Sequence, residues 1–173
     1  MRPSALKHAM YFGLLLGLIF CLNFFLQTRS SAVCDAFSWI IVLLMPYAAY
    51  RLSVDCRERA CDGSMRYGEA FLYGMQLFFY ASIVAAAFRL VYFKFLNPDF
   101  LPQLYDQTMQ TMEALQMKVT DEQMNEVRRS LTPANMTIAY VWIDVIAGVL
   151  VSFVVAFFVK KDKNDGIKVI DNW

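Results

Sequence analysis

The chain has 173 residues, of which 58% are hydrophobic, 16% aromatic and 18% charged, with a formal net charge of +1 and a mean hydropathy of +0.41. Ordinary soluble domains are about half apolar and about a quarter charged, so this composition excludes a soluble enzyme, a nucleic-acid-binding protein and a disulfide scaffold. It predicts an all-α membrane protein, because long apolar runs alternate with short charged stretches.

The first two apolar runs cover residues 9–26 and 33–50. The first carries no formal charge and is about 18 residues long, enough to cross a hydrocarbon layer of about 30 Å. The second has only Asp35 at its beginning, and the link between the runs is too short to do more than turn the chain. The two runs therefore predict a transmembrane hairpin.

A signal peptide is the competing interpretation of the first run. Lys7 precedes the apolar stretch, and residues 30–32 are small, as a cleavage site requires. The stretch is nevertheless longer than a usual signal core, and Arg29 lies close to the cleavage position. A retained membrane span is the favoured interpretation.

The third and fourth runs cover residues 70–96 and 136–159. The third is longer than a span needs and holds Arg89 and Lys94 in its last turns, so we expect a tilted or protruding helix. The fourth contains one formal charge, Asp144, and ends at a basic tail, residues 160–173. Residues 1–173 therefore predict a single membrane domain of four spans.

Basic residues set the orientation of such a protein. Ten lie before the first run, between the second and third, or after the fourth: Arg2, Lys7, Arg51, Arg57, Arg59, Arg66, Lys160, Lys161, Lys163 and Lys168. Four lie on the other side: Arg29, Lys118, Arg128 and Arg129. Both termini are therefore expected in the cytoplasm, with residues 97–133 facing outward across the inner membrane.

The outward segment, residues 97–133, has two helical patterns. Asn97 is expected to cap a helix that has Pro98 in its first turn and an apolar stripe at a spacing of three to four residues, namely Leu101, Leu104, Tyr105, Thr108, Met112 and Leu115. Thr120 and Gln123 predict a capping box that opens a second helix, which ends before Pro133. The segment is expected to be an amphipathic helical element.

Arg89 and Asp144 are the charges that lie deepest in the predicted spans. A carboxylate inside the bilayer costs about 2.5 to 3.5 kcal/mol unless it is paired or neutral. Counting from the outer ends of the two spans puts Arg89 within about 4 Å of the depth of Asp144. We expect a structural ion pair or, alternatively, part of a proton or ligand path, with Asn23 completing a polar cluster.

Four arginines lie between the second and third runs, and Glu69 follows them. Arg51, Arg57, Arg59 and Arg66 would attract anions at a membrane surface, so with Glu69 they form a candidate surface for a phosphate-bearing headgroup or a cytoplasmic partner. Plain positive-inside topology and a first-turn acid that favours the helix dipole explain the same residues.

Small residues recur at packing distance within two of the runs. Gly13 and Gly17 form such a stripe on the first run, and Gly148, Ser152 and Ala156 form one on the fourth. These stripes predict close helix packing. They leave open whether the packing is within one chain or between two copies in a homo-oligomer.

Residues for catalysis and metal binding are scarce. The cysteines Cys21, Cys34, Cys56 and Cys61 are scattered and make no framework. A zinc site at Cys56 and Cys61 would still lack two protein ligands, because His8 is the one histidine. The same histidine is the only candidate base for a hydrolytic triad, and there is no glycine-rich phosphate loop. We expect no enzyme activity, no metal and no cofactor, and we assign no role to Cys56 and Cys61.

Several segments resemble a known family. They are the 68–71 opening of the third span, its 93–101 exit, the acidic helix, Pro133 and the 157–161 exit. Together they resemble the small bacterial membrane proteins catalogued as domain of unknown function family 4199, frequent in Bacteroidetes. The resemblance implies a four-helix inner-membrane fold without an assigned activity. It also implies a possible partner, since members are often encoded beside a glycosyltransferase that uses a polyprenyl phosphate.

Two classes of function remain. The first is a non-catalytic accessory or scaffold subunit for a membrane partner, in line with the glycosyltransferase that the resemblance implies. The alternative is a small oligomeric lipid or solute carrier that uses Asp144 and Arg89. The shortage of other polar residues inside the spans favours the first.

Overall fold

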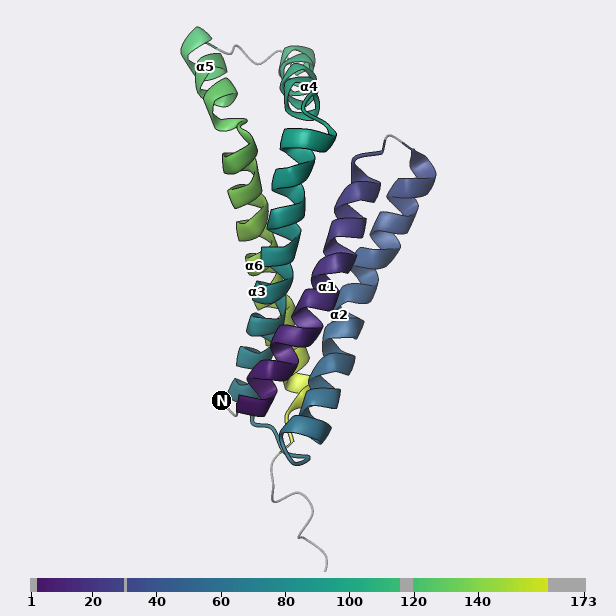
Figure 1. Ribbon diagram of the computed structural model, residues 1–173. Coiled ribbons are helices and arrows are strands. Elements are labelled where there is room, and N and C mark those ends of the chain that lie inside the picture. Colours follow the sequence, from purple (N-terminus) through teal and green to yellow (C-terminus); the bar gives the residue numbers. More distant parts are fainter. Residues whose placement is uncertain (1–2, 30, 116–119, 162–173) are drawn as a thin grey trace, which may run out of the picture. The chain divides into compact units, whose positions relative to one another are not determined.

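The computed structural model describes residues 3–29, 31–115 and 120–161, which form six α-helices and one π-helical turn (Figure 1). The helices are α1 (Pro3–Gln27), α2 (Ala32–Ala60), α3 (Tyr67–Val91), α4 (Phe100–Ala114), α5 (Asp121–Ser130) and α6 (Pro133–Val159), and the π-turn η1 (Tyr92–Leu96) extends α3. The predicted all-α class is confirmed. Residues 162–173, most of the predicted tail, lie outside the described residues.

Four of the helices are long and apolar enough to cross a membrane: α1, α2, α3 with η1, and α6. They correspond to the four predicted runs. Each helix begins before its apolar run, and α1 and α6 begin at Pro3 and Pro133, because proline is well tolerated in the first turn of a helix.

The stretch between the second and third spans differs from the sequence prediction. Residues 51–66 were expected to be a loop, but α2 continues to Ala60. No glycine or proline interrupts the stretch before Gly63, and the pair Asp55 and Arg59 is spaced by four residues, which supports a helix. The chain then turns through Asp62 and Gly63, whose φ angles of 53° and 73° lie in the left-handed region.

The chain divides into two compact units. Unit 1 contains residues 1–85 and 143–173, and unit 2 contains residues 86–142. The single four-span domain stays a prediction.

Unit 1 is held together by small residues where its helices meet. A Cβ atom on Gly13 would lie 2.7 Å from the Cβ of Tyr80, and one on Gly17 would lie 2.6 Å from the Cβ of Val84, so α1 and α3 are in backbone contact. At the contact of α3 with α6, Gly148 faces Phe78 and Gly74 faces Ser152 in the same way. The predicted glycine stripes therefore pack within one chain.

Unit 2 contains the end of α3, η1, α4, α5 and the start of α6. The predicted capping box is confirmed, since Thr120 Oγ1 accepts a hydrogen bond from the Gln123 backbone N–H and the Gln123 side chain accepts one from Thr120. Asn97 plays a different part from the predicted one. Its backbone N–H bonds to the Tyr92 carbonyl and closes the π-turn, and α4 begins only at Phe100.

The predicted apolar stripe of α4 is the less exposed side of that helix from Leu101 to Met112. Leu115, which was expected to continue it, is 67% exposed because it follows the end of the helix. Close to the stripe, the rings of Phe93 and Phe100 stack with centroids 5.7 Å apart. Aromatic packing thus fixes the start of α4 against the π-turn.

Candidate functional site

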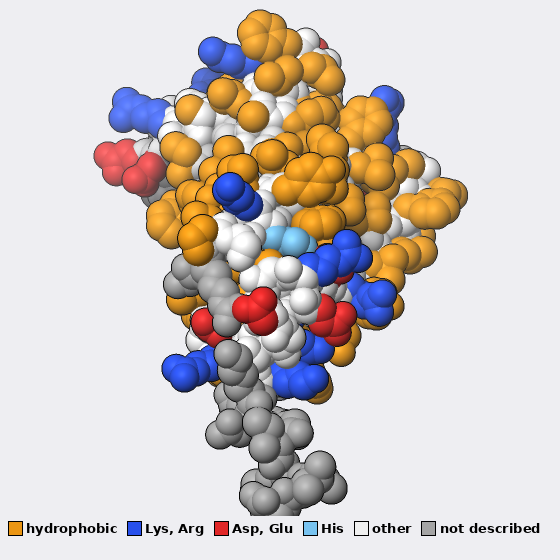
Figure 2. Space-filling view, turned by 60° about the horizontal axis from the view of Figure 1, so that its bottom comes forward, with side chains coloured by type: hydrophobic (Ala, Val, Ile, Leu, Met, Phe, Trp, Pro, Cys, Tyr) orange, Lys and Arg blue, Asp and Glu red, His pale blue; other side chains and the backbone are white. Residues whose placement is uncertain are grey.

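One end of unit 1 gathers its polar side chains, and we call it the basic end, defined by residues 3–12, 50–73 and 153–161. Here the start of α1, the end of α2, the start of α3 and the end of α6 come together (Figure 1). Figure 2 brings this end forward and shows charged side chains gathered around it beside hydrophobic ones. Any polar site of unit 1 is therefore best sought here.

Backbone carbonyls at the helix ends are satisfied by neighbouring elements. Ser4 Oγ donates to the carbonyl of Ala60 at 2.8 Å, and Arg57 Nη1 donates to the carbonyl of Val159 at 2.9 Å. Met65 and Lys161 exchange two backbone hydrogen bonds in an isolated antiparallel bridge. These contacts complete the C-terminal ends of α2 and α6, whose last carbonyls have no partner within their own helix.

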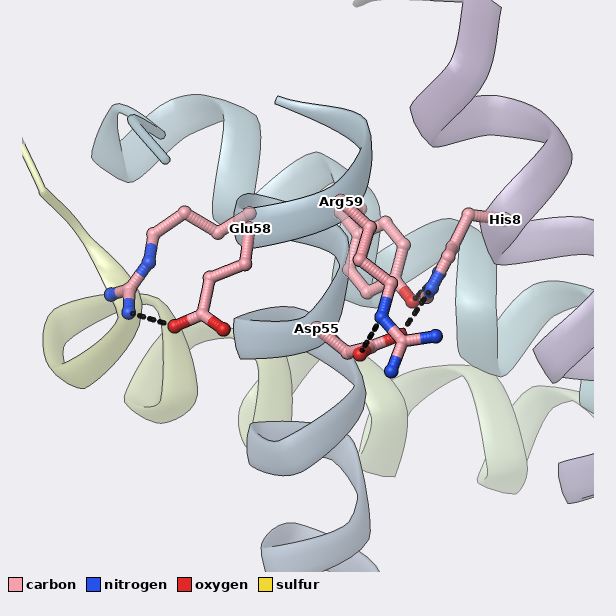
Figure 3. Close-up of polar contacts among 6 residues, drawn as sticks. His8, Asp55, Glu58 and Arg59 are labelled. Atoms are coloured by element: carbon pink, nitrogen blue, oxygen red, sulfur yellow. Dashed lines mark hydrogen bonds and ion pairs between the residues drawn. The ribbon is translucent and has the colours of Figure 1, made fainter. Parts of the chain in front are cut away.

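Four side chains from three helices form a hydrogen-bonded group that we call the His8 cluster: His8, Asp55, Arg59 and Tyr73. His8 lies 2.8 Å from the Tyr73 hydroxyl through Nδ1 and 3.0 Å from Asp55 Oδ2 through Nε2. Arg59 Nε lies 2.7 Å from Asp55 Oδ1. Figure 3 shows His8 and Arg59 converging on Asp55.

A neutral His8 with its proton on Nε2 satisfies both of its contacts: Tyr73 donates to Nδ1, and Nε2 donates to Asp55. Both oxygens of Asp55 then accept bonds, and its charge is balanced by Arg59. Tyr73 is fully buried, and the His8 side chain is 11% exposed. Because the hydroxyl is closed off, the cluster can tie α1, α2 and α3 together but cannot present Tyr73 as a nucleophile.

In the sequence His8 is a lone histidine, and its cluster with Asp55, Arg59 and Tyr73 was not predicted. The signal was nevertheless present in the sequence, because Asp55 and Arg59 are spaced by four residues and share one face of α2, which continues past the predicted end at Tyr50. Had α2 been extended, its antiparallel packing on α1 would have placed His8 at the level of Asp55.

The predicted anion surface is not one surface in the structure. Arg57 reaches α6 and Glu58, whereas Arg59 reaches Asp55. Figure 3 shows Glu58 and Arg59 on opposite sides of α2. Glu69 accepts a hydrogen bond from the Arg66 backbone N–H at 2.9 Å, which caps the start of α3. A role for these residues in binding a phosphate-bearing headgroup or partner stays a prediction.

Arg51 belongs to the same predicted group of arginines. It lines a groove between α1 and α2. The groove has a volume of about 560 Å³ and is lined by Phe12, Leu15, Leu16, Ile19, Ile41, Leu44, Met45, Tyr47, Ala48, Arg51 and Leu52. Nearly all of these side chains are apolar, and Arg51 carries the only charge among them. We call this feature the α1–α2 groove.

The predicted intramembrane polar residues have separate surroundings. Asn23 accepts a hydrogen bond of 2.8 Å from Ser38 Oγ, which joins α1 to α2 inside unit 1. Arg89 is 6% exposed, and its guanidinium carbon lies 4.8 Å from the ring centre of Tyr140, within unit 2. Asp144 belongs to unit 1, so its pairing with Arg89 stays a prediction.

Within residues 3–29, 31–115 and 120–161, no three or more His, Cys, Asp and Glu residues are grouped to hold a metal ion. Cys56 and Cys61 are both buried, and Cys56 directly follows Asp55 of the His8 cluster in the chain.

A protein-family model described as "Protein of unknown function (DUF4199)" matches residues 7–161. No curated protein and no solved structure matches the chain.

Proposed function

The chain belongs to the family described as "Protein of unknown function (DUF4199)", and we propose that it is a non-catalytic accessory or scaffold subunit of an assembly in the bacterial inner membrane. Its partner is another membrane protein that packs against α2. The polyprenyl-phosphate glycosyltransferase implied by the family resemblance is the first candidate for this partner.

The observation that carries this proposal is the small buried share of α2. Only 11% of its most apolar stretch is buried inside the chain, against 28%, 39% and 22% for α1, α3 and α6. Its outer face carries large side chains that are mostly exposed, namely Trp39 at 69%, Leu43 at 74% and Tyr47 at 60%. Large aromatic residues such as Trp39 and Tyr47 are typical of contact surfaces between proteins.

Pro46 is a second feature that favours a partner on α2. It lies inside the helix and has no N–H, so the usual hydrogen bond from residue 46 to the carbonyl of Val42 cannot form. Both residues are exposed, and in a bilayer the loss of the usual helical donor to a carbonyl is costly unless another group donates to it. A neighbouring helix that donates a side-chain hydrogen bond there would remove this cost.

A crosslinking experiment tests the proposal. A photoreactive amino acid at Leu43 is expected to give one defined protein adduct in native membranes. The matched control is Leu150 on α6, which is 65% exposed and should crosslink mainly to lipid. Lipid adducts alone at both positions would contradict a protein partner on α2, and an adduct with the mass of two chains would replace the partner by a second copy.

The proposed orientation has both termini and the basic end in the cytoplasm, as ten basic residues against four favour. Single cysteines at Ser64 and Gln110 in a cysteine-free background are expected to differ when an impermeant thiol reagent is added to spheroplasts. Gln110→Cys should be labelled and Ser64→Cys should be protected until the membrane is opened. Labelling of Ser64→Cys alone would reverse the orientation.

A further inference from the structure

We propose that the α1–α2 groove is a binding site for one acyl chain of an anionic bilayer phospholipid, whose phosphate contacts Arg51. This site lies beside the surface of the proposed partner, which would pack on the outer face of α2 at Trp39 and Leu43, and Tyr47 borders both.

The lining of the groove fits a hydrocarbon chain. Its volume of about 560 Å³ lies within the range of about 300 to 1,000 Å³ that is usual for ligand pockets. On α2 the lining runs from Ile41 to Leu52, a helix rise of roughly 16 Å. One leaflet of hydrocarbon is about 15 Å thick. The length of the groove is therefore close to the depth that an acyl chain spans in one leaflet.

Charge is placed at one end of the groove. Arg51 and Leu52 are the last lining residues on α2, and Phe12 lies at the same end on the antiparallel α1. Arg51 is exposed, whereas Arg57 and Arg59 are held by other groups of the chain. A guanidinium at the end of an apolar groove matches the layout of a phospholipid, in which a phosphate tops hydrocarbon.

The acid one helical turn after Arg51 does not cancel this attraction. Asp55 follows Arg51 by one helical turn, and its two oxygens are bound by His8 and Arg59. Its negative charge is therefore balanced within the His8 cluster. The net charge that Arg51 presents to a headgroup at this end of the groove stays positive.

The test measures lipid retention by the full chain. The protein is reconstituted in equal parts of phosphatidylglycerol and phosphatidylcholine, purified in mild detergent and examined by native mass spectrometry. Wild type is expected to keep one phosphatidylglycerol in preference to phosphatidylcholine. Arg51→Gln should reduce this preference about fivefold, the effect expected for one basic residue at a membrane surface.

Ala48→Phe fills the groove and should remove the bound lipid whatever its headgroup. Leu44→Trp does the same at a lining position that is 54% exposed, and serves if Ala48→Phe does not fold. Matched controls away from the groove are Arg66→Gln and Ala36→Phe, both at exposed positions, and they should behave as wild type. Equal retention of both lipids by wild type, or retention unchanged by Arg51→Gln or by the groove-filling variants, would overturn the site.

Discussion

Replacing Gly17 with alanine is expected to destabilise the protein, although alanine is the better helix former. The added Cβ would lie 2.6 Å from the Cβ of Val84 and 2.9 Å from the carbonyl oxygen of Ala81, so α1 and α3 would have to separate. Overpacking of this kind costs about 1 to 3 kcal/mol, which exceeds the roughly 1 kcal/mol that alanine gains over glycine in a helix. The measurement is the melting temperature in detergent, followed by size-exclusion chromatography.

Gly68 provides the matched control. It also lies in a helix, α3, but no atom lies within 4 Å of a Cβ built on it. Gly68→Ala should leave the melting temperature unchanged or raise it. Alanine is therefore expected to lower the melting temperature at Gly17 and to leave it unchanged or raise it at Gly68. Equal effects at the two positions would show that α1 does not approach α3 as closely as described.

Hydrophobicity and helix punctuation were sufficient to predict the four long helices and the Thr120 capping box, because these features depend on residues that are adjacent in the chain. The glycine stripe of α1 was also visible in the sequence. Its partner was not, because the side chains it meets belong to Tyr80 and Val84, which carry no small-residue signal, and its other contacts are backbone oxygens. Gly74 was missed for a related reason, since it contacts Ser152 without a second glycine one turn away.

The candidate site was harder to predict than the fold. Charge counting grouped four arginines because they are close in the chain. The side chains of a helix point in all directions, and the structure directs Arg57 to Val159, Arg59 to Asp55 and Arg51 to a groove. His8 and Tyr73 meet only because α1 and α3 pack side by side, which depends on tertiary contacts between distant segments.

Asp55→Ala is also expected to destabilise the protein. It leaves His8 Nε2 and Arg59 Nε without the acceptor that both now share. A buried group that loses its partner costs about 1 to 3 kcal/mol. Arg59 is 77% exposed and can bind water, so most of the loss arises at His8, whose side chain is 11% exposed. The free energy of unfolding in detergent measures the effect.

Asp55→Asn separates charge from hydrogen bonding at this position. The amide keeps one oxygen as an acceptor, so it should cost less than alanine. The control acid is Glu58 on the opposite side of α2, which is 63% exposed and lies 3.4 Å from Arg57. Exposed pairs of this kind contribute about 0 to 1 kcal/mol, so Glu58→Ala should be nearly neutral.

A double-mutant cycle decides whether His8 and Asp55 stabilise the protein as a pair. His8→Leu and Asp55→Ala each remove the same 3.0 Å contact, so once one residue is gone the second change has less left to remove. The double variant should therefore lose less stability than the two single variants summed, by about 0.5 to 3 kcal/mol. Strictly additive losses would mean that His8 is held by Tyr73 and by packing against Phe12, whose ring centroid lies 4.4 Å from its own. In that case Asp55 would stabilise the protein through Arg59 alone. His8 would then join α1 to α3 and not to α2.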